Sequence, residues 1–278
     1  MIWVVLMACG QPEQAAEPTA AGEPTAVRSS DATEGTVPGN TDDWPTADQI
    51  LLAHTRRTSQ CDLLATETYK LTWTATTLDG HAAPRVEEIL HQGRPASSYT
   101  RIHQRREPDV RFAAFGRTPE GKFWSASDGG VQADLPDEVS ASLAAGMDPT
   151  PVCNWEKRWS RRELVGPEDR SGTPTWHLKV YWNDGTPTDL WFHREKELLV
   201  ASSAKVGEID TTTEVSEYRQ YGSITWPTLE VATRKEGPLQ ITTTQKLLGL
   251  ETNLESFVDV GPRQVDAILA SAAKEAQP

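Results

Sequence analysis

The chain has 278 residues, which is enough to bury the core of one large domain or two small ones, so size does not restrict the fold. Its 27 Lys and Arg stand against 40 Asp and Glu, and the formal net charge of −13 disfavours binding to nucleic acid. Behind residue 8 no segment approaches the roughly 20 apolar residues that a transmembrane helix needs. Membrane association would therefore have to come from the N-terminus.

The first eight residues, MIWVVLMA, are apolar and directly precede Cys9. This pattern allows three interpretations: a signal peptide with a chance cysteine, the first strand of a domain, or a lipid attachment site. The sequence LMAC resembles the lipobox of bacterial lipoproteins, which implies that Cys9 is the acylated first residue of the mature protein. Since no Lys or Arg precedes the apolar run, we interpret residues 1–8 as the remnant of a longer signal peptide.

The segment that follows is expected to be a disordered tether. Residues 10–44 contain almost no large apolar side chain before Trp44 and are rich in Ala, Pro, Thr, Gly and Glu. Such a segment cannot bury enough apolar surface to offset the entropy lost on ordering. A flexible chain of this length reaches about 30 to 35 Å. With a lipid on Cys9, the tether at 9–44 would hold the domain clear of a membrane.

Export also bears on the two remaining cysteines, Cys61 and Cys153. An oxidising compartment would allow them to form a disulfide. The alternative is a pair of buried free thiols. A structural zinc site is not expected, because the sequence has no CxxC pair and no histidines beside these cysteines.

A capping box predicts the first helix of the domain. Thr46 is suited to the N-cap, Gln49 follows three positions later, and the helical pattern continues to about Arg57. A second helix is expected over 136–144, lying across the concave face of the sheet. The final segment, 263–278, is Ala-rich and is expected to form a peripheral helix or a tail.

The rest of the domain, placed at residues 45–262, has the pattern of a long antiparallel meander. Polar and apolar residues alternate from Thr68 onwards, and short turn sequences separate the segments. Further strands are predicted over 85–92, 97–106, 110–117, 122–127, 175–182, 188–193, 198–206, 211–221, 224–234 and 239–248. They indicate one extended and strongly curved sheet.

The hairpin around Asp184 and Gly185 also has a predicted register. A two-residue loop would pair Leu178 with Trp191 and mix apolar with polar side chains on one face. A three-residue loop with Gly185 in a left-handed bulge segregates them, and it pairs Trp176 with Phe192, Leu178 with Leu190 and Val180 with Thr188. We therefore prefer the second register, which leaves Trp191 on the polar face.

The order of these elements resembles the LolA/LolB-like family of outer-membrane lipoprotein-sorting proteins over roughly residues 46 to 260. Three stretches carry the resemblance: DLWFHREKELLV (189–200), YGSITWP (221–227) and NLESF (253–257). In order, they are similar to the family's paired strands around a D-x-x-T-G-L turn, its x-G-x-x-x-P strand entry and its closing N-x-x-x-x-F element. The first stretch lacks the glycine of the family's turn.

The resemblance implies an α+β fold: a large curved antiparallel sheet, or half-barrel, with helices covering the concave face around an apolar cavity. In the best-known members this cavity holds the acyl chains of lipoproteins. Eight apolar residues are candidates for lining it, although they could equally form a plain core: Leu71, Trp73, Trp176, Leu178, Val180, Leu190, Phe192 and Trp226. A lipid on Cys9 would match the family's anchored acceptor branch.

No motif for nucleophilic catalysis, zinc hydrolysis, phosphate or dinucleotide binding occurs, so we expect neither an enzyme nor a cofactor. His91 and His103 could face each other across the turn near Gly93, but solvated strand positions are the simpler interpretation, and no metal site is expected. One basic concentration suits an anionic lipid headgroup or an acidic partner, with a solvated strand face as the alternative: Arg101, Arg105, Arg106 and Arg111.

These observations predict a lipoprotein anchored to the outer membrane and facing the periplasm, which binds lipid acyl chains or another apolar molecule. The alternative is a scaffold or sensor of the envelope that binds another protein, with the cavity filled by its own side chains. A third hypothesis, stacking against glycans, needs exposed aromatic rings. Trp155, Trp159 and Trp191 are the candidates for such rings.

Overall fold

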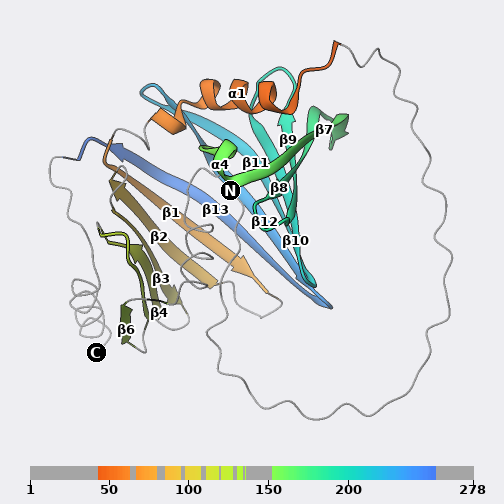
Figure 1. The fold of residues 1–278 in the computed structure, drawn as a ribbon. Helices are drawn as coiled ribbons and strands as arrows, with labels where there is room; N and C mark the ends of the chain where they lie inside the picture. Colours follow the sequence, from red (N-terminus) through yellow and green to blue (C-terminus); the bar gives the residue numbers. More distant parts are fainter. Residues whose placement is uncertain are drawn as a thin grey trace, which may run out of the picture. The chain divides into compact units, whose positions relative to one another are not determined.

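Within each half of this protein, consecutive strands lie side by side, and both halves belong to one open antiparallel sheet (Figure 1). The computed structural model describes residues 43–62, 67–79, 85–94, 98–107, 111–118, 120–127, 130–133, 135 and 152–254. Within these ranges the sheet has 13 strands in the order β6-β5-β4-β3-β2-β1-β13-β12-β11-β10-β9-β8-β7. The predicted α+β fold with a large curved antiparallel sheet is confirmed.

The helices are α1 (Ala47–Thr58) and the single turn α4 (Trp155–Arg158). The N-terminal strands are β1 (Tyr69–Leu78), β2 (Arg85–Arg94), β3 (Ser98–Glu107), β4 (Arg111–Arg117), β5 (Phe123–Ser127) and β6 (Gly130–Ala133). The C-terminal strands are β7 (Trp159–Arg170), β8 (Thr173–Trp182), β9 (Pro187–His193), β10 (Leu199–Val206), β11 (Ile209–Tyr221), β12 (Ile224–Glu236) and β13 (Leu239–Thr252).

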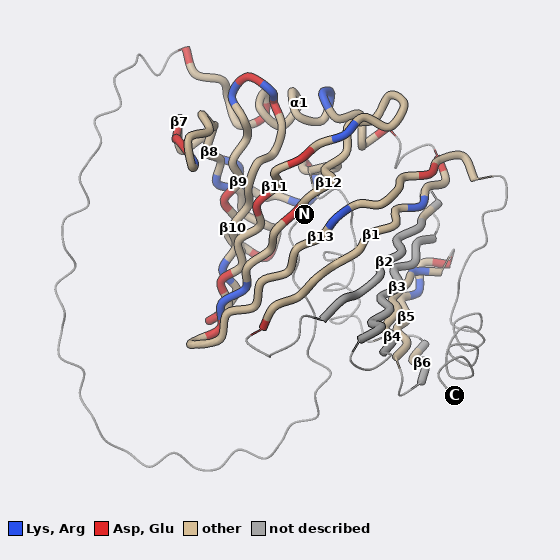
Figure 2. The backbone as a smooth tube through the Cα atoms, turned by 180° about the vertical axis from the view of Figure 1, so that it is seen from behind, with Lys and Arg blue, Asp and Glu red and all other residues tan. Residues whose placement is uncertain are grey.

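Two meanders, β1–β6 and β7–β13, meet where the first strand of one pairs with the last strand of the other. The pairing of β1 with β13 runs from Tyr69 opposite Thr252 to Leu78 opposite Thr242, with a bulge near Trp73. Figure 2 shows the two sets of strands joined along this seam. The sheet is therefore continuous although its halves are far apart in sequence.

Strand β7 was not predicted, and it forms one edge of the sheet. Its register against β8 shifts near Ser160 and Val165, which breaks the alternation of side chains between the two faces. Gly166 has a φ of +145°. Bulges, charged side chains and a proline such as Pro167 are features that protect an edge strand from pairing with another chain. The short strand β6 at the opposite edge was also missed.

The predicted hairpin register is confirmed. Trp176 pairs with Phe192, Leu178 with Leu190 and Val180 with Thr188. The Trp182 amide donates to the Thr186 carbonyl across a three-residue loop, and Gly185 has a φ of +87°. The left-handed conformation is one that glycine adopts without steric cost, so the turn sequence determines which side chains share a face.

Helix α1 begins as predicted. The Thr46 hydroxyl accepts from the Gln49 amide at 3.2 Å, and the Gln49 side chain accepts from the Thr46 amide at 2.7 Å. The buried side chains of α1, which include Ile50 and Leu51, face the sheet. Just behind the helix, Cys61 forms the predicted disulfide with Cys153, 92 residues further along the chain.

Several predictions lie outside the described residues: the lipobox with Cys9, most of the tether, the helix at 136–144 and the C-terminal segment 263–278. Within the described part, no helix is long and apolar enough to cross a membrane.

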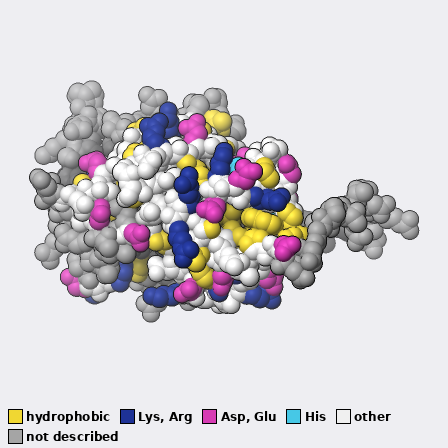
Figure 3. Space-filling model, turned by 90° about the horizontal axis from the view of Figure 1, so that it is seen from above, with side chains coloured by type: hydrophobic (Ala, Val, Ile, Leu, Met, Phe, Trp, Pro, Cys, Tyr) yellow, Lys and Arg dark blue, Asp and Glu magenta, His cyan; other side chains and the backbone are white. Residues whose placement is uncertain are grey.

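Acidic and basic side chains are interspersed on the face seen from above, with hydrophobic side chains between them (Figure 3).

Candidate functional site

The face of the sheet that packs against α1, called the inner face here, carries a first apolar cluster. Four of the predicted cavity residues, Leu178, Val180, Leu190 and Phe192, belong to this cluster and are at most 2% exposed. They share it with residues of α1 such as Ile50 and Leu51, and the partly buried Trp176 packs against it. These four side chains therefore leave almost no surface open to solvent.

A second apolar cluster lies on β1, β12 and β13. It contains the predicted residues Leu71, Trp73 and Trp226, which are 0%, 3% and 0% exposed. Strand register places Trp73 directly opposite Leu247. All eight predicted residues thus belong to, or pack against, these two clusters.

Between the strands that carry the first cluster and those that carry the second, the inner face has buried polar side chains. Direct cross-strand pairs lead from Leu190 of the first cluster through Ser202 to Thr213. From Ala75 of the second cluster, pairs lead through Gln245 to Glu230. We call Ser202, Thr213, Glu230 and Gln245 the polar belt; they are 3%, 1%, 1% and 5% exposed.

Sequence analysis missed the polar belt, although a signal for it was available. In a strand, every second side chain lies on the same face, so the stretch ITWPTLE, residues 224–230, puts Glu230 on the same face as Trp226. Glu230 was not singled out, and an acidic side chain at a core position is rare. Among the residues whose burial the structure describes, which leave out most of β2 and β3, Glu230 is the only buried Asp, Glu, Lys or Arg side chain.

His54 fixes α1 to the sheet. Its ring is buried, lies edge-on to Phe192 with ring centroids 5.2 Å apart, and its Nδ1 is 3.0 Å from the carbonyl oxygen of Glu197. Burial lowers the pKa of His54 from 6.5 to about 4, since desolvation penalises the charged ring. The neutral ring can donate only if its proton is on Nδ1.

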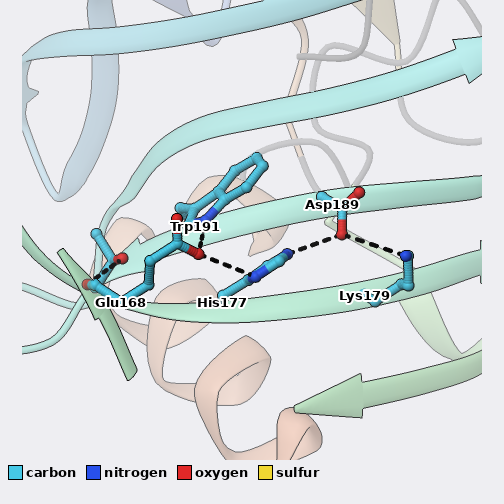
Figure 4. Close-up of polar contacts among 6 residues, drawn as sticks. Glu168, His177, Lys179, Asp189 and Trp191 are labelled. Carbon is cyan, nitrogen blue, oxygen red and sulfur yellow. Dashed lines mark hydrogen bonds and ion pairs between the residues drawn. The ribbon is translucent and has the colours of Figure 1, made fainter. Parts of the chain in front are cut away.

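The opposite, outer face carries a polar cluster around His177 (Figure 4). The His177 Nε2 is 2.8 Å from Asp189 Oδ1, and its Nδ1 is 3.1 Å from Glu168 Oε2. The same Glu168 oxygen accepts from the Trp191 indole at 2.9 Å, and Lys179 approaches Asp189 at 4.0 Å. These contacts tie β7, β8 and β9 together.

Trp191 lies on the polar face as predicted, but it is only 7% exposed. The His177 ring stacks on it at 4.7 Å, and the Arg170 guanidinium lies 4.1 Å from the indole centroid. Trp159, expected to point outward, is buried in the core at 1% exposure, and Trp155 packs against the core with Arg162 over its ring. None of these three rings is a free stacking platform, so the glycan hypothesis loses its basis.

The register of β2, β3 and β4 places the remaining candidates. His91 is opposite Arg101 and His103 is opposite Ile89, so the two histidines occupy diagonal rather than directly opposite positions on β2 and β3. Arg105 is opposite Arg111. Alternation puts positions 101 and 105 of β3, and position 111 opposite 105, on one face of the sheet, whereas a bulge in β3 falls at position 106. The part of the chain that the structure describes contains no cluster of potential metal ligands.

The chain matches no protein-family model and, by sequence, no curated protein. In structure it is similar to a domain assigned to outer membrane lipoprotein sorting from Vibrio parahaemolyticus, with a TM-score of 0.56 and 11% identity over 80% of this chain and 99% of the other. A DUF1329 family protein from Desulfovibrio piger gives a TM-score of 0.53 and 12% identity, covering 76% and 95%.

A LolA superfamily protein from Nitrosomonas europaea gives a TM-score of 0.52 and 13% identity, covering 78% of this chain and 96% of the other. Identities this low carry information on the fold and leave the ligand open. The curved antiparallel sheet with α1 across its inner face, together with these likenesses, shows that the chain has the LolA/LolB-like fold that the sequence resemblance predicted.

Proposed function

We propose that this protein is an anchored lipoprotein of the bacterial envelope that binds a lipid or another apolar ligand on its inner face without catalysing a reaction. The observation that carries the proposal is the inner face itself, a curved sheet with two apolar clusters beneath and beside a helix. The fold likeness to a domain assigned to lipoprotein sorting supports a role in lipid or lipoprotein trafficking.

The sequence supplies the rest of the proposal. The lipobox-like LMAC would attach the protein to the outer membrane through Cys9, and residues 9–44 would act as a tether for a domain at 45–262 facing the periplasm. The basic residues Arg101, Arg105, Arg106 and Arg111 would suit an anionic headgroup or partner.

A second candidate function is binding to another envelope protein. The tight packing of the predicted cavity residues favours it, since Leu71, Val180 and Phe192 are 0% exposed. If these side chains fill the hollow, the fold would serve as a scaffold and its partner would bind elsewhere.

Mass spectrometry of organic extracts distinguishes the two functions. The protein would be expressed in a periplasm and purified without detergent; a lipid that co-purifies at about one per protein supports the carrier, whereas a clean extract from folded protein supports the scaffold. A Cys9→Ser variant should leave the membrane fraction and stay folded. Retention of this variant in the membrane fraction would refute the anchor.

A further inference from the structure

We propose that the polar belt makes the inner face selective for amphipathic lipids that carry hydrogen-bond donors, such as hydroxyl, amide N–H or ammonium groups, between or beside their apolar parts. This inference rests on the proposed lipid binding. It adds the class of lipid, which the apolar clusters alone would not specify.

The first step of the argument is the burial of Glu230. At 1% exposure its carboxyl group lies on the face of β12 that also carries Ile224, Trp226 and Thr228, which are 7%, 0% and 5% exposed. Burying a carboxylate costs free energy unless donors surround it. An apolar residue at this position would suit a receptor for plain hydrocarbon better.

Glu230 lies between the two apolar clusters in the sheet. Its cross-strand neighbours on the inner face are Val215 on β11 and Gln245 on β13, and Gln245 is in turn opposite Ala75 of the second cluster. Thr213 and Ser202 continue the belt to Leu190 of the first cluster. An acyl chain that spanned both clusters would therefore cross hydrogen-bonding groups.

The third step is the chemistry of those groups. A carboxylate offers about four acceptor positions, so Glu230 can accept from protein donors and from a ligand donor together. The Gln245 amide and the hydroxyls of Ser202 and Thr213 can both donate and accept. A ligand carboxylate or phosphate beside Glu230 would put two acidic groups into one buried site, which disfavours ionisation of both, whereas a hydroxyl, amide or ammonium group would donate to Glu230.

The test uses the full chain carrying Cys9→Ser and two probes of equal chain length, dodecanoic acid and N-dodecanoyl ethanolamine, below their aggregation concentrations. Each competes at pH 7 with an environment-sensitive fluorescent probe. We expect the ethanolamide to bind at least about ten-fold more tightly than the acid, because hydrogen bonds to charged groups are stronger than neutral ones.

A Glu230→Gln variant, with folding checked by circular dichroism, should reduce this preference to about two-fold. Glu217→Gln, which removes a charge from an exposed position of β11, is the matched control and should keep the preference. If Glu230→Gln does not fold, Thr213→Val takes its place and should lower the preference about three-fold.

Equal affinities of the wild-type protein for the two probes would overturn the inference and leave lipid binding intact. A preference that survives Glu230→Gln, or Thr213→Val in its place, would overturn it as well. Failure of the folded protein to bind the reporter or either probe would overturn the proposed function, and the inference with it.

Discussion

His54 in α1 and Glu197 in the turn between β9 and β10 are 143 residues apart, and the His54 Nδ1 lies 3.0 Å from the Glu197 carbonyl oxygen. Glu197 has a φ of +58°, the left-handed conformation that a glycine would adopt more readily. This is the turn where the chain lacks the glycine of the resembling family. The helix is thus docked on the carbonyl group of a residue in an unusual backbone conformation.

The stability of the protein should depend on pH through His54. Its pKa is about 4 in the folded state and near 6.5 when exposed, so between these values the unfolded chain binds more protons. The stabilisation from the neutral ring is complete above pH 6.5 and is lost as the pH falls through 4, by about 3 kcal/mol in total. Denaturant unfolding between pH 4 and 7 measures it, and His54→Gln should flatten the curve. An unchanged slope in this variant would assign the dependence to other groups.

Removing the disulfide should destabilise the protein strongly. Cys61 and Cys153 are 92 positions apart, and a cross-link closing so long a loop stabilises by about 4 to 5 kcal/mol in the chain-entropy model. The double variant Cys61→Ser, Cys153→Ser and the reduced wild-type protein should show the same loss in urea unfolding. A loss below about 1 kcal/mol in both would show that the native contacts already hold these segments together.

Two glycines offer a matched test of packing. A Cβ on Gly116 of β4 would overlap the ring of Trp124, whereas a Cβ on Gly249 of β13 would meet nothing within 4 Å. We expect Gly116→Ala to destabilise by about 1 to 3 kcal/mol and Gly249→Ala to change stability by about 0.5 kcal/mol or less. Thermal unfolding of both variants checks this expectation. Equal effects would mean that the Trp124 ring has room to move.

The indole N–H of Trp191 can be tested separately from its ring. Trp191→Phe keeps an aromatic ring between His177 and Arg170 but removes the donor to Glu168, and it should cost about 1 to 3 kcal/mol. Trp191→Ala should cost more, because it also removes the buried ring. If the two variants are equally stable in urea unfolding, the hydrogen bond rather than the ring carries the energy.

Local signals predicted local structure well. The Thr46 cap and the 176–192 hairpin depend on residues close in sequence, and both were predicted correctly. Strand β7 was missed because its bulges and Gly166 interrupt the alternation on which strand prediction rests. The burial of His54 and Glu230 depends on segments far apart in sequence, so the alternation along β12 indicates the face of Glu230 but does not establish its burial.

The disulfide also determines how a mechanical load would travel through the protein. Cys61 follows α1 directly, and Cys153 lies just before α4 and β7. A pull applied at Thr46, with β7–β13 held by a bound partner, would pass along α1 and across the sulfur bridge into β7. The meander β1–β6 lies within the closed loop and would carry none of the covalent load, so a tethered protein could bear tension while half of its sheet remains relaxed.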